Sequence, residues 1–317
     1  MKKTLLLILM ALITTIVIGC AGNEIVSPFT DDEPFVIEMK NDTLKILQVT
    51  DLHLTYGIDA NDQKTLRTIE WLTKSDEFDL IVISGDLFMS PSAPRLFRQL
   101  IRRMEALDTP WTFVFGNHET DFQEYVTLLQ QIPETKNLYF KVGPELEDGG
   151  YGNFRIVFTQ AGVPFYNAYF LDSHAEREVY TEEEGVYDYL KSSQVDWYET
   201  HVSTDDVDSV VYMHMPLRQY INPASYVGIF NEDKVYAQGV DTGFFDAMVR
   251  HGRSKGVFVG HDHLNDFYLT MNGIILAYGR ITGYNAYGNL ERGGRVVFVD
   301  SNQTMNTYVL LESEVRP

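Results

Sequence analysis

The sequence predicts an α/β protein built from layers of sheet and helix. Two observations support this fold class: β-rich and helical patterns alternate from Phe35 onward, and several short apolar runs end in polar residues, as strands of α/β sheets do. The 317 residues are 44% apolar and 22% charged, which allows a sizeable core and excludes both a disordered chain and a polytopic membrane protein. We expect one large domain over residues 35–317.

Two long helices are predicted by apolar residues at helical spacing, the first after Asn61-Asp62 and the second after Ser92. The second helix has an arginine-rich face, which we interpret as solvated in so acidic a chain. Shorter helices are expected near residues 123–131, 193–201 and 244–251.

Five predicted strands end in the same way, with side chains that can bind a metal. The runs and the residues after them are Leu44–Thr50 before Asp51-Leu52-His53, Leu80–Ser84 before Gly85-Asp86, Trp111–Phe115 before Gly116-Asn117-His118-Glu119, Val210–Met213 before His214, and Val257–Val259 before Gly260-His261-Asp262-His263. Ligands of open α/β sheets bind outside the carboxyl ends of the strands, so we expect these residues to converge. The glycines before Asp86, Asn117 and His261 are expected to permit sharp turns.

The collected residues are suited to transition metals. They comprise two Asp, one Asn and five of the chain's eight His, and the single cysteine, Cys20, leaves only N and O ligands. Neutral imidazole with carboxylate suits Zn, Fe, Mn or Ni better than Ca or Mg alone. Seven ligands and a spare histidine exceed the needs of one ion, whereas two ions sharing a carboxylate explain the set. His174, His201 and His251 lack this context, and we interpret them as structural or surface residues.

The ordered motifs resemble the calcineurin-like metallophosphoesterase superfamily over about residues 44–311. Residues 260–267 (GHDHLNDF), 278–284 (YGRITGY) and 194–198 (QVDWY) are similar to a purple-acid-phosphatase-like branch that includes the yeast Dcr2 phosphatase and plant homologues. The resemblance implies a two-sheet β-sandwich flanked by helices, with four α/β/β/α layers and a dimetal site at its edge.

The resemblance also implies roles for single residues. It assigns the seven ligands to two metals: Asp51, His53 and His263 to the first, Asn117, His214 and His261 to the second, and Asp86 to both. His118 would be a non-ligand histidine beside the scissile oxygen, oriented by Glu119. Met89 stands where purple acid phosphatases have a tyrosine, so an obligatory Fe(III) is not implied, and we expect Fe, Mn or Zn.

The predicted function is a dimetal-dependent phosphoester hydrolase, and we expect a phosphomonoesterase. A hydroxide shared by the two metals would attack phosphorus in line, while His118 stabilises or protonates the departing oxygen. A phosphodiesterase acting on cyclic nucleotides or phospholipid head groups is the main alternative. A surface lipoprotein that binds metal without turnover is another, and a mononuclear hydrolase would leave the second ligand set unexplained.

Substrate selection is expected in the long segment 217–240, which starts close after His214 and would form a lid or wall. Arg218, Tyr220 and Arg280 are the candidate substrate contacts. The alternatives are a packed loop and, for Arg280, a structural salt bridge. The 25 Lys+Arg against 45 Asp+Glu give a net charge of −20, which argues against a nucleic-acid partner and favours small esters. No protein partner is evident.

The amino-terminal residues indicate export. Lys2 and Lys3 precede an apolar run over residues 5–18, which is too short to span a bilayer comfortably, so a cleaved signal over residues 1–19 is expected. Residues 17–20 (VIGC) resemble a bacterial lipobox, which implies lipidation of Cys20 and anchoring at the bacterial cell envelope. An ordinary signal peptide is the alternative. Residues 20–34 are expected to form a tether.

Overall fold

The computed structural model describes residues 29–147 and 149–317. The predicted export signal, Cys20 and the tether as far as residue 28 lie outside the described residues. Across the described ranges, every helix is too short or too polar to cross a membrane.

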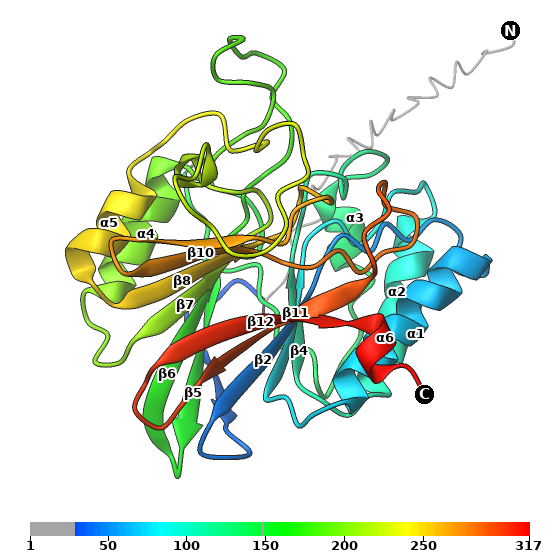
Figure 1. The fold of residues 1–317 in the computed structure, drawn as a ribbon, viewed down its shortest axis with the longest axis horizontal. Helices are drawn as coiled ribbons and strands as arrows, with labels where there is room; N and C mark the ends of the chain where they lie inside the picture. Colours follow the sequence, from blue (N-terminus) through cyan, green and yellow to red (C-terminus); the bar gives the residue numbers. More distant parts are fainter. Residues whose placement is uncertain (1–28, 148) are drawn as a thin grey trace, which may run out of the picture.

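Two mixed sheets form the centre of the molecule (Figure 1). The larger sheet has the strand order β1 (Phe35–Glu38), β5 (Phe154–Gln160), β6 (Val163–Phe170), β7 (Ser209–Tyr212), β8 (Ser254–Val259), β10 (Ile274–Tyr278) and β9 (Tyr268–Met271). The smaller sheet has the order β12 (Met305–Leu311), β11 (Gly293–Val299), β2 (Leu44–Val49), β3 (Leu80–Ser84) and β4 (Trp111–Val114).

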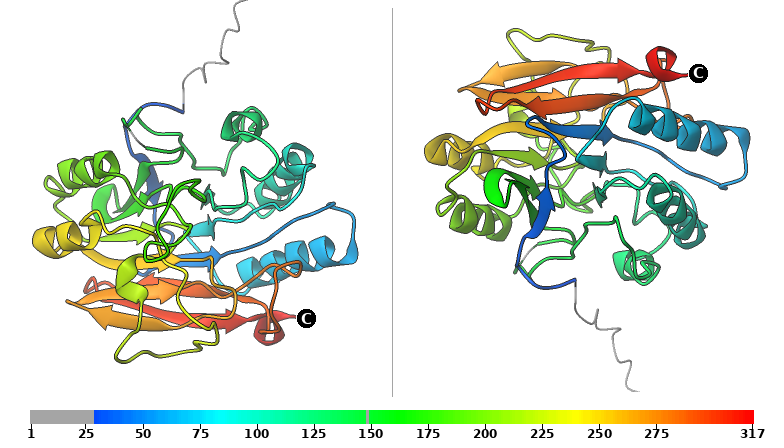
Figure 2. Two further views of the ribbon diagram at one scale, coloured as in Figure 1. Left: turned by 90° about the horizontal axis from the view of Figure 1, so that it is seen from above. Right: turned by 90° about the horizontal axis from the view of Figure 1, so that it is seen from below.

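Helices cover the outer faces of both sheets, as Figure 2 shows from above and below. The helices α1 (Ala60–Lys74) and α2 (Ala93–Glu105) flank the smaller sheet, with α3 (Tyr125–Leu129) beside α2 and α6 (Glu312–Val315) against α1. The larger sheet is flanked by α4 (Ser192–Val202) and α5 (Phe244–His251), and the short 3₁₀ turn η1 (Arg218–Tyr220) follows β7. The predicted four-layer α/β/β/α arrangement is confirmed.

Alternating side chains of the larger sheet build two cores. On β7, Val210 and Tyr212 face the smaller sheet, whereas Val211 and the following Met213 face the α4/α5 layer. Because successive side chains of a strand point to opposite faces, a continuous apolar run is what a sheet covered on both sides requires. This explains why the strands appear as uninterrupted apolar runs in the sequence.

The two sheets meet at the edge where the five predicted strands end. Strands β2, β3 and β4 are parallel to one another, and so are β7 and β8 in the other sheet. Hydrogen bonds join the sheets there: Gln48 Nε2 donates to the Val259 carbonyl at 2.9 Å, and the His214 ring Nδ1 lies 2.9 Å from the Ser84 carbonyl. The carboxyl ends from both sheets therefore share one edge.

The described end of the predicted tether is bound to the folded chain. Asp31 forms an ion pair with Lys141, and the Asp32 carboxylate lies 2.9 Å from Trp197 Nε1 and 2.8 Å from His201 Nε2. The acidic side chains at this end of the predicted tether therefore have partners on the folded chain.

Candidate metal centre

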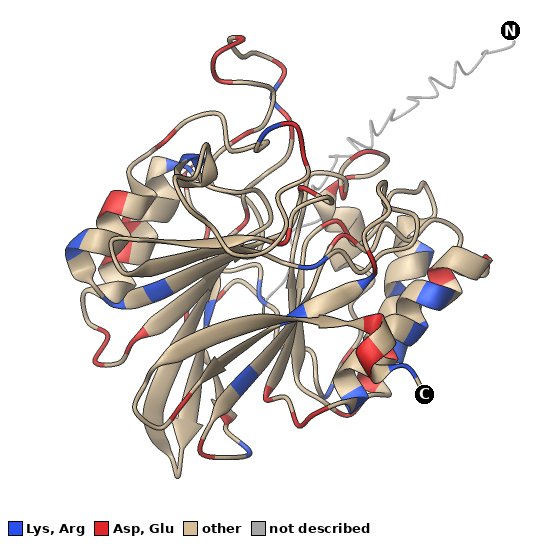
Figure 3. Cartoon of the chain, in the orientation of Figure 1, with Lys and Arg blue, Asp and Glu red and all other residues tan. Residues whose placement is uncertain are grey.

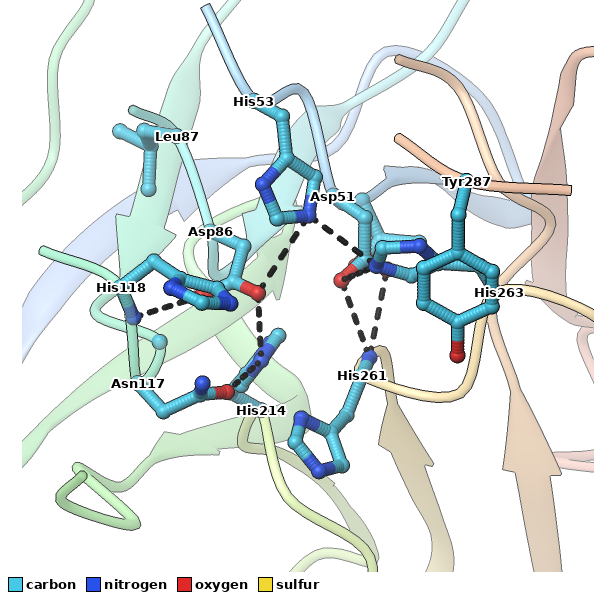
Figure 4. A network of polar contacts seen from close by, with 12 residues as sticks. Asp51, His53, Asp86, Leu87, Asn117, His118, His214, His261, His263 and Tyr287 are labelled. Carbon is cyan, nitrogen blue, oxygen red and sulfur yellow. Dashed lines mark hydrogen bonds and ion pairs between the residues drawn. The ribbon is translucent and has the colours of Figure 1, made fainter. Parts of the chain in front are cut away.

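The structure brings the seven predicted ligands together at the shared sheet edge (Figure 4). Two groups of buried side chains each offer ligand atoms within 4.8 Å of one another: Asp51, His53, Asp86 and His263 in one, and Asp86, His214 and His261 in the other. The seventh residue joins the second group, because Asn117 Oδ1 lies 3.1 Å from His214 Nε2. Residues from five strand ends thus form one cluster.

Asp86 stands between the two groups. Its Oδ2 lies 3.5 Å from His53 Nε2 and 3.2 Å from His214 Nε2, and its Oδ1 accepts a hydrogen bond from the His118 backbone N–H at 3.0 Å. One carboxylate oxygen therefore faces both groups, which is the position that a bridging ligand of a two-metal site occupies.

The spacing of the ligand atoms fits bound cations. His53 Nε2 and His263 Nε2 face each other at 3.0 Å, and His263 Nε2 lies 3.4 Å from Asp51 Oδ1. In a tetrahedral site with bonds of about 2.0–2.1 Å, neighbouring ligand atoms lie about 3.4 Å apart. Within the described part of the chain, the buried Nε2 of His261 also has no hydrogen-bond partner. The donor set and its spacing therefore fit a pair of transition-metal ions.

Burial and charge set the protonation states that metal ligands need. Burial lowers the pKa of His53 to about 4 and that of His261 to about 3, so both rings are neutral. Burial alone would raise the pKa of Asp51 and of Asp86, but attraction to His263 and His214 respectively outweighs it, and both pKa values are lowered. The cluster thus offers ionised carboxylates and neutral imidazoles, the forms in which these groups coordinate metal.

Unlike His53 and His261, His214 has a raised pKa. Burial disfavours its charged form, but the adjacent Asp86 carboxylate outweighs burial and raises its pKa to about 10. Its Nδ1 is directed at the Ser84 carbonyl, so Nε2 is the nitrogen that faces Asp86 and Asn117. A cation bound here would displace the Nε2 proton, in the way that metal binding generally releases protons from its ligands.

The backbone is strained at four candidate ligands. Asp51, His53, Asp86 and His261 have φ values of 54°, 45°, 52° and 80°. This left-handed region is uncommon for residues other than glycine and costs about 1–3 kcal/mol each. Backbone hydrogen bonds hold the first two turns, from Asp51 N to the Gly85 carbonyl and from His53 N to the Asp86 carbonyl. Strain gathered at the ligands indicates a site in which side-chain direction is under functional constraint.

Glycines precede three of the candidate ligands, and only one of them is needed for the predicted sharp turn. Gly85 has φ of 96° and does permit a sharp turn, whereas Gly116 and Gly260 are required for space. A Cβ on Gly116 would lie 2.3 Å from Asp86 Oδ1, and one on Gly260 would lie 2.1 Å from Thr50 Oγ1 and 2.9 Å from Asp51 Oδ2. Close packing against the ligands therefore dictates these two glycines.

Gly260→Ala should displace Asp51 and weaken the first metal position. Because a misplacement of about 1 Å near a reacting centre can cost about 100-fold in rate, we expect a loss of that order together with less than two metal ions per chain. Metal analysis and rate assays check this. Gly273→Ala, in a turn where a Cβ meets open space, should lower stability through its positive φ but keep both metals. Full metal content in Gly260→Ala would contradict the prediction.

A cavity of about 540 Å³ opens over the cluster. Five of the seven candidate ligands and His118 form its floor, while Asp51 and His214 lie outside the lining. The remaining wall is made by Met89, Tyr187, Glu232, Tyr236, Asp262, Asn285, Ala286 and Tyr287. Glu232 and Tyr236 come from the segment 217–240 that the sequence predicts as a substrate wall, whereas Tyr187, Asn285, Ala286 and Tyr287 have no signal in the sequence that marks them as functional.

The predicted pairing of His118 with Glu119 is wrong. The Glu119 carboxylate is buried and accepts backbone N–H groups of Leu87 at 2.6 Å, Phe88 at 3.2 Å and Gly116, and burial raises its pKa to about 7. It therefore ties the turn after β3 to the end of β4. The partner of His118 is Asp121, whose Oδ2 lies 2.8 Å from His118 Nδ1. The separation of three positions between the two residues is the feature of the sequence that could have indicated this pairing.

The three predicted substrate contacts do not line the cavity, and the structure corrects that prediction. Tyr220 is fully buried and donates to the Val257 carbonyl at 2.8 Å, while Arg218 donates to the Gly239 carbonyl at 3.0 Å. Arg280 forms a buried ion pair with Asp266 at 2.5 Å, which is the structural alternative. From the segment 217–240, it is Glu232 and Tyr236 that reach the cavity wall.

The other histidines lie outside the cluster, as predicted. A ring nitrogen of His174 contacts Gln194, one of His201 contacts Asp32, and one of His251 contacts Glu199.

Known proteins share this fold and parts of this sequence. A probable inactive purple acid phosphatase 14 from Arabidopsis thaliana is 28% identical over 312 residues, covering 83% of this chain and 76% of that protein. A probable cyclic nucleotide phosphodiesterase from Xenorhabdus bovienii is 27% identical over 100 residues, covering 29% of this chain and 40% of that protein. The narrower resemblance to the yeast Dcr2 phosphatase stays a prediction.

Solved structures confirm the fold. A dimetal phosphatase from Danio rerio superposes with a TM-score of 0.59 at 12% identity, covering 85% of this chain and 96% of that one. The purple acid phosphatase PPD1 from yellow lupin superposes with a TM-score of 0.54 at 11% identity, covering 86% of this chain and 52% of that one. The model of the calcineurin-like phosphoesterase family matches residues 44–265, which include all seven candidate ligands. With its two-sheet fold and its cluster of seven metal-binding side chains, the chain belongs to the calcineurin-like phosphoesterase family.

Proposed function

We propose that this chain is a dimetal-dependent phosphomonoesterase. The observation that supports this most is the position of Asp86 Oδ2 between two buried ligand groups, beneath a cavity that also exposes His118. Asp51, His53 and His263 would hold one ion and Asn117, His214 and His261 the other, with Fe, Mn or Zn as the expected metals. When bound, such a pair activates water and neutralises charge on the phosphoryl oxygens.

His118 is positioned to supply a proton to the leaving group. When a phosphomonoester is hydrolysed, a P–O bond to water forms, the P–O bond to the alcohol breaks, and the alcohol oxygen takes up a proton. The contact of Nδ1 with Asp121 leaves Nε2 of His118 for the cavity. Burial would lower the pKa of His118, but the Asp86 and Asp121 carboxylates outweigh it and raise the pKa, which favours the protonated ring. His118 is therefore our candidate general acid.

Asp121 is a positioning residue, and its removal should act through His118. Asp121→Ala should lower kcat by about 10- to 100-fold for alkyl phosphates, whose leaving group needs a proton, and by much less for p-nitrophenyl phosphate, whose leaving group does not. KM should change little. Asp121→Asn keeps an acceptor for Nδ1–H and should retain most of the activity. An equal loss on both substrates would indicate a merely structural role for Asp121.

The choice between monoester and diester is tested with matched substrates. Hydrolysis of p-nitrophenyl phosphate is compared with that of bis(p-nitrophenyl) phosphate, using protein supplied with Mn, Zn or Fe. We expect the monoester to be the better substrate, and a markedly faster diester reaction would overturn the proposal.

Catalysis itself also needs a direct test, because Arabidopsis relatives are named as probable inactive purple acid phosphatases. This chain retains seven candidate ligands and His118 around an open cavity, which supports turnover. A protein that binds two metals per chain yet hydrolyses no member of a broad phosphoester panel would be a binding protein instead.

We also propose that the protein is exported and anchored at the bacterial cell envelope by lipid on Cys20, on the strength of the apolar run and the VIGC motif. Metabolic labelling with palmitate should modify the chain, and Cys20→Ser should abolish both the label and membrane fractionation. Unlabelled, soluble wild-type protein would contradict the lipid anchor.

A further inference from the structure

The cavity wall beyond the candidate ligands is aromatic and acidic. It contains three tyrosines, Tyr187, Tyr236 and Tyr287, and the carboxylate of Glu232. Within the described part of the chain, the lining of this cavity includes no lysine or arginine. The part of a substrate that lies beyond its phosphate therefore meets phenol rings and negative charge.

These side chains come from three separate loops and contact one another or the candidate ligands. The rings of Tyr187 and Tyr236 meet edge to face, with centroids 6.4 Å apart at 90°. Figure 4 shows the Tyr287 ring over the His263 ring, and the two ring centroids are 4.1 Å apart. The Tyr287 hydroxyl donates a hydrogen bond to Glu232 Oε1 at 2.5 Å. Because Tyr287 is 53% exposed, much of this side chain stays open to a ligand.

One ring of the wall already makes a cation–π contact within the chain. The Lys234 ammonium lies 4.9 Å from the centroid of the Tyr236 ring. Ring faces of tyrosine attract cations, and recognition of quaternary ammonium groups by several aromatic rings is a general use of this attraction. Glu232 adds a full negative charge beside Tyr287. Figure 3 shows further Asp and Glu residues along the loops around this edge, which adds to the field that draws a cation inward.

We propose that the alcohol part of the substrate carries an ammonium group, so that the substrate is a phosphoester of a choline-like amino alcohol. This inference rests on the proposed function, since it assigns the phosphate to the metal-binding floor and the cation to the tyrosine and Glu232 wall. Hydrolysis would use water to break the P–O bond to the amino alcohol and release that alcohol and phosphate.

Other leaving groups fit the wall less well. A second phosphate or a carboxylate would approach the carboxylates of Glu232 and Asp262, whereas the lining includes no lysine or arginine and the Lys234 ammonium, outside the lining, is already engaged on the Tyr236 ring. A neutral aromatic alcohol could stack on the tyrosines but would gain nothing from the carboxylate. Only a cationic group uses both the rings and the charge.

The direct test compares phosphocholine with 3,3-dimethylbutyl phosphate, which has the same shape but no positive charge. We expect kcat/KM for phosphocholine to be higher by about 10- to 100-fold. Glycerophosphocholine, a diester with the same cation, is assayed as well. Its rate relative to phosphocholine shows whether the substrate is a free phosphomonoester or derives from a lipid head group.

Two variants assign the selectivity to the wall. Glu232→Gln keeps the acceptor oxygen but removes the charge, so it should reduce the preference for phosphocholine over the neutral isostere several-fold. Tyr287→Leu should reduce the preference as well. The matched controls are Glu182→Gln and Tyr180→Leu, exposed residues of the Tyr187 loop that lie outside the cavity lining and should keep the wild-type preference.

The outcomes separate this inference from the proposed function. Activity on p-nitrophenyl phosphate with equal kcat/KM for phosphocholine and its isostere would overturn the inference alone. If the protein hydrolyses no phosphoester, saturation-transfer NMR on zinc-loaded protein still tests the wall with choline and 3,3-dimethylbutanol. A stronger signal for choline that Glu232→Gln removes would support the inference, and equal signals would overturn it.

Discussion

Asp86→Asn should reduce the metal content of the purified protein from two ions to one or none and lower phosphatase turnover by about 10³-fold or more. The substitution keeps the shape of the side chain but removes the negative charge that faces both His53 and His214. Two-metal sites supply several kcal/mol of transition-state stabilisation, and each 1.36 kcal/mol corresponds to a tenfold change in rate. Elemental analysis and steady-state assays with p-nitrophenyl phosphate measure both effects.

Asp79→Asn is the matched control. Asp79 is equally buried, but it accepts backbone N–H groups of Lys40 and Lys45 at the start of β3, away from the cluster. This variant should lose some stability and keep both metals. Two metals per chain and full turnover in Asp86→Asn would show that Asp86 does not bridge the ions.

His118→Ala should lower turnover by about 10²–10⁴-fold while the metal content stays at two ions per chain. The ring lies beside the candidate ligands, 5.3 Å from the His53 ring, but its Nδ1 contacts Asp121 and it belongs to neither ligand group. As with Asp121→Ala, the loss should be larger for alkyl phosphates than for p-nitrophenyl phosphate. Its dependence on the leaving group would identify His118 as the proton donor.

His251→Ala serves as the control, because His251 contacts Glu199 and belongs to neither ligand group, so the rate should stay unchanged. Loss of a metal ion from His118→Ala would contradict the prediction and make His118 a ligand.

The cluster could be predicted from the sequence because strand geometry places it. Parallel strands end at the same edge, so the residues directly after apolar runs such as 80–84 and 257–259 have little freedom in where they lie. The runs are also continuous, since both faces of the larger sheet are covered, which makes the strand ends easy to locate. The convergence of Asp51, Asp86 and His214 therefore follows from the strand pattern alone.

The surroundings of the cluster could not be predicted in the same way. Side-chain partners in turns depend on local geometry, so Glu119 binds backbone N–H groups while Asp121 takes the place beside His118. Arg280 forms a buried ion pair with Asp266, which stands 14 positions earlier in the chain. No periodicity in the sequence indicates this contact. Tyr187 and Tyr287 reach the cavity on loops whose course is set by tertiary contacts.

An anomalous diffraction experiment on crystals grown with manganese tests the central claim most directly. We predict two strong peaks in each molecule, roughly 3.5–4 Å apart, one on each side of the Asp86 carboxylate. A single peak in the cluster, or none, would contradict the two-metal centre on which the proposed phosphatase activity depends.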